Sequence, residues 1–503
     1  MDFLVLSPPV LPPSEPPSGA FLLAAGLAGS GKKTGFLDLS IAFFHHLLRP
    51  LKGADRNALD YLLNTATGYT PEPHRSAAGR LHAVISVFEQ KFPGWKLTLM
   101  DIAPPGRVHH PLALAAQTDA KDPFTETYET CLGPILSERK PRSVLISLAY
   151  LSQLPAAVSL HRFLENRGIS AVVGGSLPNS LNATGHGFTA LQAVFPCIVL
   201  GDGSALLDNS SGLPLVDRIA WPELLGDAPY LSCRPVLPLL LSTGCYWNRC
   251  LFCPDRDLPY HSVPTEAIRR FLAEMPDEIR KKGPVIHLLD SALPPKSLRA
   301  FLPAAAENGV RFFGFARPTA HLLKDNLLED AADAGCIMLQ LGAEGGAFEL
   351  LDRFDKGLRP EESTEVIQRS AAAGIRTYLY LLFGLPRETD EDRQKTLKWA
   401  EALGDSVDFL NLSLFNLPRF CELTCRAEEF GIQPGDYPPD PEGEGIRLYR
   451  PFSCDGTDPK ETARRFLKTF RAVPNIRAAH LQTPRWFRAA HPALMRLIKR
   501  RDP

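Results

Sequence analysis

The stretch LLLSTGCYWNRCLFCPD, residues 239–255, decides the interpretation of this chain. It places Cys245, Cys250 and Cys253 at the spacing Cys-x4-Cys-x2-Cys, directly after an apolar run that is typical of a buried strand. Three thiols so close together in a long chain indicate metal ligation before disulfide bonding. Because they follow a strand, we expect them at its carboxyl end, where the active sites of α/β barrels form.

This spacing suits one iron–sulfur cluster. Three thiolates can hold three irons of a cubane cluster and leave the fourth iron open, as a catalytic metal requires. Cys250 and Cys253 would also suit a zinc knuckle, but zinc normally takes a fourth protein ligand. No second ligand pair follows, and His261 stands alone nearby. Zinc binding and three unrelated cysteines remain the alternatives.

Composition sets broad limits. The 503 residues suffice for about three domains, and 45% hydrophobic with 22% charged residues is ordinary for a globular protein. A net charge of −1 gives no electrostatic case for nucleic acid or an anionic membrane. The proline-interrupted start lacks the basic region of a signal peptide, and no apolar run is long enough to span a membrane. We therefore expect a cytoplasmic protein with reduced thiols.

The first part of the chain alternates apolar runs with helical patterns, which predicts a doubly wound, Rossmann-like parallel sheet. The predicted strands are 2–7, 36–40, 143–150, 170–175 and 197–203, and the predicted helices are 18–29, 41–49, 76–91 and 153–167. Such sheets bind ligands at the carboxyl ends of their strands. Those ends carry Ser147, Gly174, Gly175, Gly201 and Gly203, and the glycines could equally be turn residues.

A second series of strands and helices begins at residue 236 and predicts a partial (β/α)6 barrel. Its strands are expected at 237–242, 285–289, 311–315, 337–342, 377–383 and 408–415, with helices at 264–274, 325–335, 360–373 and 390–403. We divide the chain into an N-terminal domain at 1–215, a linker at 216–235, the barrel at 236–428 and a C-terminal extension at 429–503.

The extension is expected to contain a loop over 430–458, a helix over 459–471 and a basic tail over 485–501. The tail carries Arg485, Arg488, Arg496, Lys499, Arg500 and Arg501. A solvated terminal helix is the plain interpretation, and binding of RNA or a leader peptide is the alternative.

The cysteine loop resembles the cluster-binding loop of the radical S-adenosylmethionine (SAM) superfamily. It departs from that family's commonest spacing by one extra residue within Tyr246–Arg249, while the aromatic Phe252 before the last cysteine matches. The resemblance implies a [4Fe–4S] cluster on Cys245, Cys250 and Cys253, with SAM chelating the open iron and Phe252 near the adenine.

Later segments match the same family in order and spacing. In HLLDSAL (287–293) the resemblance assigns Asp290 and Ser291 to the SAM amino group, against the alternative of a helix N-cap. In FFGFARP (312–318), Arg317 could pair with the SAM carboxylate or brace the barrel.

Two further positions follow from the resemblance. Glu344, in LQLGAEGG (339–346), would accept hydrogen bonds from SAM, and Gly384 would lie near the adenine. Glu388 and Thr389 are expected to begin a helix rather than to act in catalysis. The sequence names no residue that acts on the substrate.

Residues 1–215 resemble the cobalamin-binding N-terminal domain of one radical SAM subgroup. The Asp-x-His-x-x-Gly motif that supplies a histidine to cobalt is absent, and His45 and His46 lie in an apolar helix. Cobalamin would therefore lack a histidine ligand, and a vestigial domain is the alternative.

Three hypotheses follow: a cobalamin-dependent methyltransferase or C–H-modifying enzyme, a cobalamin-independent enzyme acting on a peptide or RNA, and a non-catalytic iron–sulfur or zinc protein. The expected partners are a substrate of unknown class (small molecule, peptide or RNA) and a reductant such as flavodoxin or ferredoxin. No membrane and no clear nucleic-acid signature is expected. The near-match GLAGSGKKT (26–34) to a phosphate-binding loop is rejected because Lys33 replaces the magnesium-binding hydroxyl and a helical pattern precedes it.

Overall fold

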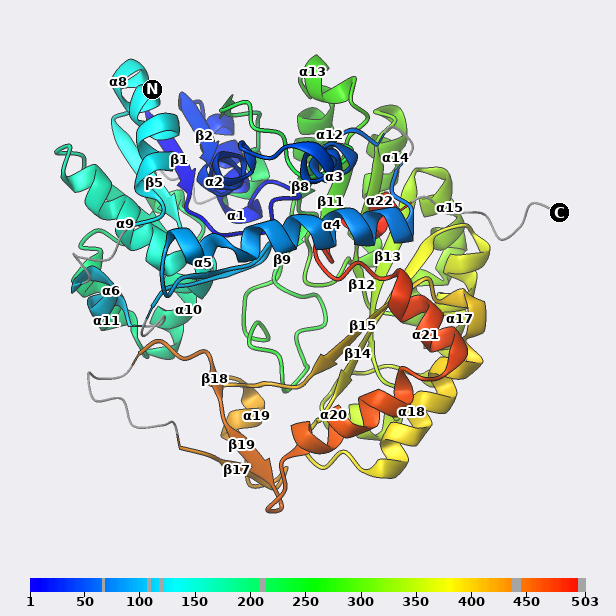
Figure 1. The fold of residues 1–503 in the computed structure, drawn as a ribbon. Coiled ribbons are helices and arrows are strands. Elements are labelled where there is room, and N and C mark those ends of the chain that lie inside the picture. The colour runs from blue at the N-terminus through cyan, green and yellow to red at the C-terminus, as the bar shows by residue number, and fades with distance from the viewer. Residues whose placement is uncertain (66–67, 106–109, 117–121, 208–213, 437–444, 496–503) are drawn as a thin grey trace.

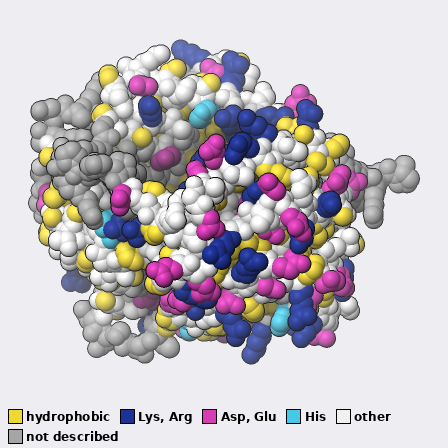
Figure 2. Space-filling model, turned by 90° about the horizontal axis from the view of Figure 1, so that it is seen from below, with side chains coloured by type: hydrophobic (Ala, Val, Ile, Leu, Met, Phe, Trp, Pro, Cys, Tyr) yellow, Lys and Arg dark blue, Asp and Glu magenta, His cyan; other side chains and the backbone are white. Residues whose placement is uncertain are grey.

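Two parallel sheets lie side by side in the computed structural model, which describes residues 1–65, 68–105, 110–116, 122–207, 214–436 and 445–495. The N-terminal sheet lies at the upper left of Figure 1 and the second, larger sheet at the right. Figure 2 shows acidic and basic side chains interspersed over the lower face. Within the described residues, no helix is both long and apolar enough to cross a membrane.

The N-terminal sheet has five parallel strands in the order β6-β5-β1-β2-β7. These strands are β1 (Phe3–Ser7), β2 (Thr34–Asp38), β5 (Ser143–Ser147), β6 (Ala171–Gly174) and β7 (Glu223–Leu225). The larger helices around them are α1 (Ser18–Gly29), α2 (Leu39–Leu48), α3 (Gly53–Asn64), α4 (Pro71–Ser86) and α9 (Leu154–Glu165). The doubly wound α/β prediction for this region is confirmed.

Two details of the N-terminal region differ from the prediction. Residues 197–203 form no strand: Ile198 makes a single bridge to Val173, and the positive φ angles of Gly201 (+86°) and Gly203 (+89°) turn the chain away. The segment expected to be a plain linker contributes β7 to the sheet. The near-match at 26–34 runs from helix α1 into strand β2, the reverse of a phosphate-binding loop.

The second sheet has six parallel strands in the order β15-β14-β13-β12-β11-β8, as expected for a partial barrel. Its strands are β8 (Val236–Leu239), β11 (Val285–Leu288), β12 (Arg311–Ala316), β13 (Cys336–Glu344), β14 (Arg376–Phe383) and β15 (Phe409–Leu414). Its helices include α12 (Thr265–Ala273), α14 (Pro295–Glu307), α15 (Leu327–Asp333), α17 (Pro360–Ala372) and α18 (Asp390–Ala402). In the described residues no pairing joins β15 to β8, so the barrel is open.

The two faces of this sheet belong to different cores. Side chains such as Ile286, Phe312 and Leu379 pack with the barrel's helices. Their neighbours Phe313 and Tyr378 instead join the core of the N-terminal region. Because successive side chains of a strand point to opposite faces, the N-terminal region covers the inner face of the open barrel.

The C-terminal part departs from the prediction. Short strand pairs, β16 (Leu417–Pro418) with β18 (Tyr449–Arg450) and β17 (Ile432–Pro434) with β19 (Phe452–Cys454), replace part of the expected loop. The helices α20 (Pro459–Phe470) and α21 (Pro474–Gln482) follow, and then a short α22 (His491–Leu494).

The prediction of a solvated terminal helix is wrong for the described residues of this segment. Ala490, Ala493, Leu494 and Met495 are buried in the N-terminal core, because this segment returns across the molecule to it. Met495 forms a bridge to Tyr69. Arg496, Lys499, Arg500 and Arg501 lie outside the described residues.

A buried pair of histidines, His74 and His491, holds the C-terminal segment against the N-terminal core. His491 Nε2 lies 2.7 Å from the Leu231 carbonyl oxygen, and its Nδ1 lies 2.7 Å from His74 Nε2. The carbonyl can only accept, so we infer that neutral His491 donates to it and accepts from His74. Burial lowers the pKa of His74 to about 4 and that of His491 well below its usual value. Both rings are therefore neutral in the folded protein near pH 7.

This pair predicts a loss of stability in mild acid. Unfolded histidines bind protons below their ordinary pKa of 6.5, whereas folded His74 does not until near pH 4, and the pKa of folded His491 is also well below its usual value. The stabilisation is therefore full above about pH 6.5 and is lost as the pH falls toward 4. Between pH 7 and 5 we expect the free energy of unfolding to drop by on the order of 2 kcal/mol per histidine.

Urea denaturation at both pH values measures this drop. The double variant His74→Gln/His491→Gln should be less stable at pH 7 and should lose much of the pH dependence. His321→Gln, which changes an exposed ring, should retain it. Equal pH dependence in the wild type and the double variant would contradict this role.

Candidate cofactor site

A short pair of antiparallel strands closes the base of the cysteine loop. After β8, strand β9 (Ser242–Thr243) pairs antiparallel with β10 (His261–Ser262), so residues 244–260 form one closed excursion. Gly244 has a φ of +70°, and a Cβ there would lie 2.5 Å from the Pro259 carbonyl oxygen. Glycine is therefore required where the loop begins.

The three thiols lie together in this excursion. Cys245, Cys250 and Cys253 are all half-buried and free of disulfides. Burial, with smaller contributions from the nearby Asp255, Cys250 and Cys245, raises the pKa of Cys253 to about 12. Loading a metal group would therefore release protons from these thiols.

The cysteine loop does not have the arrangement of a site for a single metal ion. No three His, Cys, Asp or Glu side chains in the part of the chain that the structure describes are arranged to hold one metal ion. His261 is engaged elsewhere, because its Nε2 lies 2.7 Å from Asp217 Oδ1.

The extra residue of the loop is absorbed in a turn that Trp247 anchors. Its indole N–H donates to the Asp355 carbonyl oxygen at 2.7 Å, and its ring leaves no room for a side chain at Gly357. Asn248 follows with a φ of +42°. The loop is thereby fixed to the turn that follows α16 (Phe348–Arg353).

Arg317 lies beside this anchor, just beyond the end of β12. Its side chain is buried, donates to the carbonyl oxygens of Lys356 and Gly357, and lies 4.0 Å from the Trp247 ring. Burial lowers the pKa of Arg317. Its Nε and Nη1 are buried without a hydrogen-bond partner among the described residues. Unpaired guanidinium donors of this kind suit a carboxylate.

Glu344 and Lys356 form an ion pair next to these groups. Lys356 Nζ lies 2.7 Å from Glu344 Oε1, and both side chains are largely buried. Glu344 ends β13 with a φ of +64°, a left-handed conformation that is uncommon for a residue other than glycine. Positive charge on Lys356 and Arg317 opposes the rise that burial causes in the pKa of Cys250. The structure thus brings Cys250, Arg317, Glu344 and Lys356 together, and Lys356 was not singled out from sequence.

Asp290 and Ser291 follow just after β11, and only Asp290 is buried. Asp290 is buried and accepts hydrogen bonds from Leu241 N–H (3.1 Å) and Ser242 Oγ (2.6 Å), where the chain leaves β8. Burial raises the pKa of Asp290 to about 6, against the effect of these hydrogen bonds. The alternative of a helix N-cap is wrong, because Pro294 caps α14. Ser291 is exposed.

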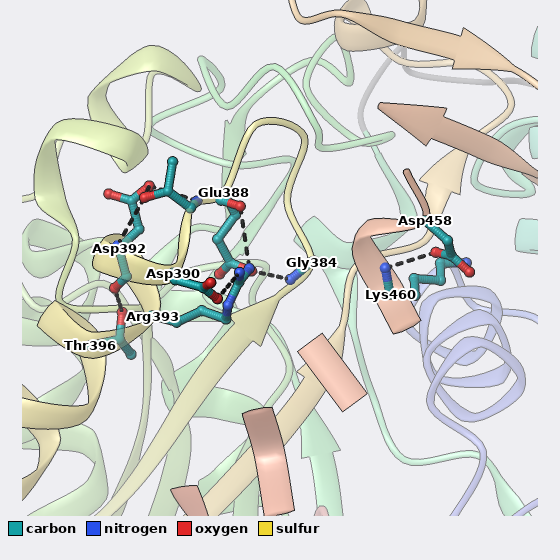
Figure 3. A network of polar contacts seen from close by, with 9 residues as sticks. Gly384, Glu388, Asp390, Asp392, Arg393, Thr396, Asp458 and Lys460 are labelled. Atoms are coloured by element: carbon teal, nitrogen blue, oxygen red, sulfur yellow. Dashed lines mark hydrogen bonds and ion pairs between the residues drawn. The ribbon is translucent and has the colours of Figure 1, made fainter. Parts of the chain in front are cut away.

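The remaining predicted residues lie around the loop. Phe252 packs with ring centroids 6.1 Å from Phe354 and 6.4 Å from Phe415. Gly384, just after β14, donates its N–H to Glu388 Oε2 at 2.8 Å, and Glu388 is also 3.0 Å from Arg393 (Figure 3). Burial raises the pKa of Glu388 to about 7.

Helix α18 begins as predicted at Thr389, whose hydroxyl accepts from Asp392 N–H. The network in Figure 3 shapes the turn after β14. It faces α20, since a Cβ on Gly384 would lie 3.3 Å from the Pro459 carbonyl oxygen.

The carboxyl edge of the N-terminal sheet faces the barrel. Glu15, in the loop after β1, lies 2.8 Å from His287 of β11. Small residues, Ser147, Gly174 and Gly175, end β5 and β6, and Tyr150 beside them is 61% exposed. His45 and His46 are engaged elsewhere: His45 lies 2.6 Å from the Pro229 carbonyl oxygen, and His46 lies 3.2 Å from Glu126.

Residues 239–400 match the family model of the radical SAM superfamily. This part of the chain is a radical SAM domain. It contains the cysteine loop and the Arg317, Glu344 and Lys356 group.

Two solved structures resemble the wider chain. TsrM, a radical SAM methyltransferase from Kitasatospora setae, matches over 93% of this chain and 88% of its own, with a TM-score of 0.53 and 14% identity. The cobalamin-dependent radical SAM enzyme OxsB matches over 86% of this chain and 56% of its own, with a TM-score of 0.49 and 14% identity. The likeness to TsrM shows that the Rossmann-like sheet and radical SAM domain share one overall fold with it.

A curated relative, an uncharacterised methyltransferase of Pyrococcus horikoshii, is 21% identical over 179 residues. The match covers 35% of this chain and 38% of the relative, so the chain matches little more than a third of that relative's length.

The position of Asp290 predicts that it supports the loop. Asp290→Ala would leave Leu241 N–H without its acceptor, and we expect a loss of roughly 1–3 kcal/mol in the free energy of unfolding. The exposed neighbour Ser291→Ala should change it by less than about 0.5 kcal/mol. Urea denaturation of both variants without added iron measures the difference, and equal stabilities would refute the bracing role.

Proposed function

We propose that this chain is a radical SAM enzyme that cleaves SAM reductively at a [4Fe–4S] cluster held by Cys245, Cys250 and Cys253. The observation that carries the proposal is the geometry of the loop. The loop carries three free thiols in one segment just after β8, within the part of the chain that matches the radical SAM family model, beside a buried arginine with two donors that have no partner among the described residues.

The residues fit a cluster with one open iron. All three thiol donors come from the one loop that β9 and β10 close. The nearby His261 already contacts Asp217 through a hydrogen bond. Burial raises the pKa of Cys250, and the nearby cationic Arg317 and Lys356 oppose that rise, which favours the thiolate that ligation needs. A bound cluster would supply one electron to the sulfonium of SAM.

The chain's own residues would hold and shield SAM. We assign Arg317 to the SAM carboxylate, because its buried Nε and Nη1 have no hydrogen-bond partner among the described residues and can each donate a charge-assisted hydrogen bond. Glu344, oriented by Lys356, would accept from the amino group or ribose, and Phe252 and Gly384 would border the adenine. Asp290 would act indirectly, by fixing the chain before Cys245. The buried surroundings would exclude water from the reacting atoms.

For the N-terminal domain we propose cobalamin binding and, from it, methyl transfer or a related C–H modification. The small residues Ser147, Gly174 and Gly175 lie at the carboxyl edge of β5 and β6, which is the edge where such sheets bind ligands, and this edge faces the barrel through Glu15 and His287. With His45 and His46 engaged elsewhere, the cobalt would lack a histidine from that helix.

The wider context of this function is also a proposal. We assign 1–215 to the cobalamin-binding domain, 216–235 to a connecting segment that adds β7 to the sheet of that domain, 236–428 to the radical SAM barrel and 429–503 to an extension. An electron donor such as flavodoxin or ferredoxin would supply the reducing electron in a cytoplasmic setting.

Removal of any one ligand should abolish the cluster. We expect Cys245→Ala, Cys250→Ala and Cys253→Ala each to lose most of the iron and sulfide that the wild type takes up on anaerobic reconstitution, about four of each per chain. Cys197→Ala, at an exposed cysteine outside the loop, is the matched control. Full iron content in all three loop variants would contradict the assignment of these cysteines as cluster ligands.

Arg317 should affect SAM affinity more than cluster content. Arg317→Gln removes the charge-assisted donors, so we expect the Kd for SAM of the reconstituted protein to rise by about tenfold or more. Calorimetric titration measures this, with Arg249→Gln, an exposed arginine of the same loop, as control. An unchanged Kd in Arg317→Gln would limit this residue to bracing the turn at 356–357.

Cobalamin retention tests the methyl-transfer part separately. Protein purified from cells supplied with cobalamin should carry about one equivalent, visible in its absorption spectrum after desalting. Rapid loss of cobalamin while SAM cleavage persists would favour a cobalamin-independent enzyme.

A further inference from the structure

A cationic groove runs along the outer edge of β15, away from the cysteine loop. Two hollows of about 710 Å³ and 520 Å³ make it up, and they share Leu412 and Arg471. The cationic side chains that line it are Arg75, Lys460, Arg464, Lys468, Arg471, Arg485 and Arg488. No Asp or Glu appears in the lining of either hollow within the described residues.

Helix periodicity accounts for one wall of this groove. Lys460, Arg464 and Lys468 are spaced four residues apart on α20, so they share one face of the helix. That face lines the hollow beside Leu412 and Leu414 of β15. The other wall comes from α4 and from the segment after α21, which contributes Arg485 and Arg488.

The positive charge of the groove is not neutralised by ion pairs within the described residues. The hydrogen bonds of these side chains go to neutral acceptors: Arg75 to the Leu481 carbonyl oxygen, Lys460 to Asn416 and Arg488 to Asn411. Asp458, the N-cap of α20, lies outside the lining and accepts a hydrogen bond from the backbone N–H of Lys460 at 2.8 Å (Figure 3).

The excess of charge also affects a neighbouring histidine. His480 lines the larger hollow, and its Nδ1 is buried without a hydrogen-bond partner among the described residues. Burial lowers the pKa of His480, and the positive charges of Arg471 and Arg488 lower it further. The chain as a whole has a net charge of −1, so this concentration of cations is local.

The floor of the groove indicates the form of the ligand. The partly buried Leu412 and Leu414 supply apolar surface between the cationic walls, above the buried Leu410 and Leu467. β15 is the end strand of its sheet in the described residues, and Leu410 N–H already donates to Thr483 Oγ1 at 2.8 Å, so an extended chain can lie along the edge beyond Leu410. The lining holds one aromatic residue, Trp486, whose ring packs on His82 with centroids 4.6 Å apart. Single-stranded nucleic acid would call for a series of stacking platforms.

We propose that this groove docks an extended acidic segment of a partner polypeptide, with its carboxylates on the cationic walls and its apolar side chains on the leucine floor. The docking is separate from the cluster chemistry and does not depend on the proposed function. Its strength should fall with added salt, because the cationic side chains are exposed and screened.

The test is fluorescence anisotropy with the full chain and a labelled decapeptide of alternating glutamate and valine, at low salt. We expect saturable binding by the wild type. Arg464→Glu/Lys468→Glu, a change of two exposed residues, should weaken it by about tenfold or more. The matched control is Lys281→Glu/Lys282→Glu, which makes the same change in charge just after α13 (Asp277–Arg280), at the far side of the molecule (Figure 1), and should bind within about twofold of the wild type.

Three outcomes would overturn the proposal. Absence of peptide binding by the wild type, or equal weakening in both double variants, would show that the groove is no acidic-peptide site. A labelled oligouridylate that binds through Arg464 and Lys468 where the peptide does not would replace the polypeptide by nucleic acid. Circular dichroism of each variant verifies its fold, and none of the measurements requires a cluster.

Discussion

The candidate site depends on the attachment of the cysteine loop to the turn at residues 354–357. Trp247 donates to Asp355 and closes over Gly357, Leu251 N–H donates to the Phe354 carbonyl oxygen at 3.0 Å, and Arg317 donates to the carbonyl oxygens of residues 356 and 357. One turn thus fixes the loop, positions the arginine and presents Lys356 to Glu344. A loop of seventeen residues without this attachment would pay a large entropic cost on binding a cofactor.

The six strands of the second sheet were predictable because buried parallel strands are apolar runs bounded by turn residues. For example, the strands predicted at 377–383 and 408–415 are found in the structure at Arg376–Phe383 and Phe409–Leu414. The cysteine spacing was likewise sufficient to find the loop. In the N-terminal region, however, Glu223–Leu225 is too short and too polar at its start to be distinguished from a linker by sequence. It is a strand because it pairs with β2.

Side-chain direction was the part that sequence could not supply. Asp290 stands at the end of β11, a position open either to a ligand or to the neighbouring chain, and here it turns to Leu241 and Ser242. The burial of residues 490–495 was missed for a related reason. The segment is interspersed with arginines and a proline, and only contact with the distant N-terminal core makes its apolar residues part of a core.

The central claim is an open iron that takes SAM. The most direct measurement is the EPR spectrum of anaerobically reconstituted, dithionite-reduced protein, recorded with and without SAM. The account predicts a reduced [4Fe–4S] signal whose g-values and line shape change when SAM is added. A reduced cluster signal that SAM leaves unchanged, or a protein that takes up zinc and no cluster, would contradict it.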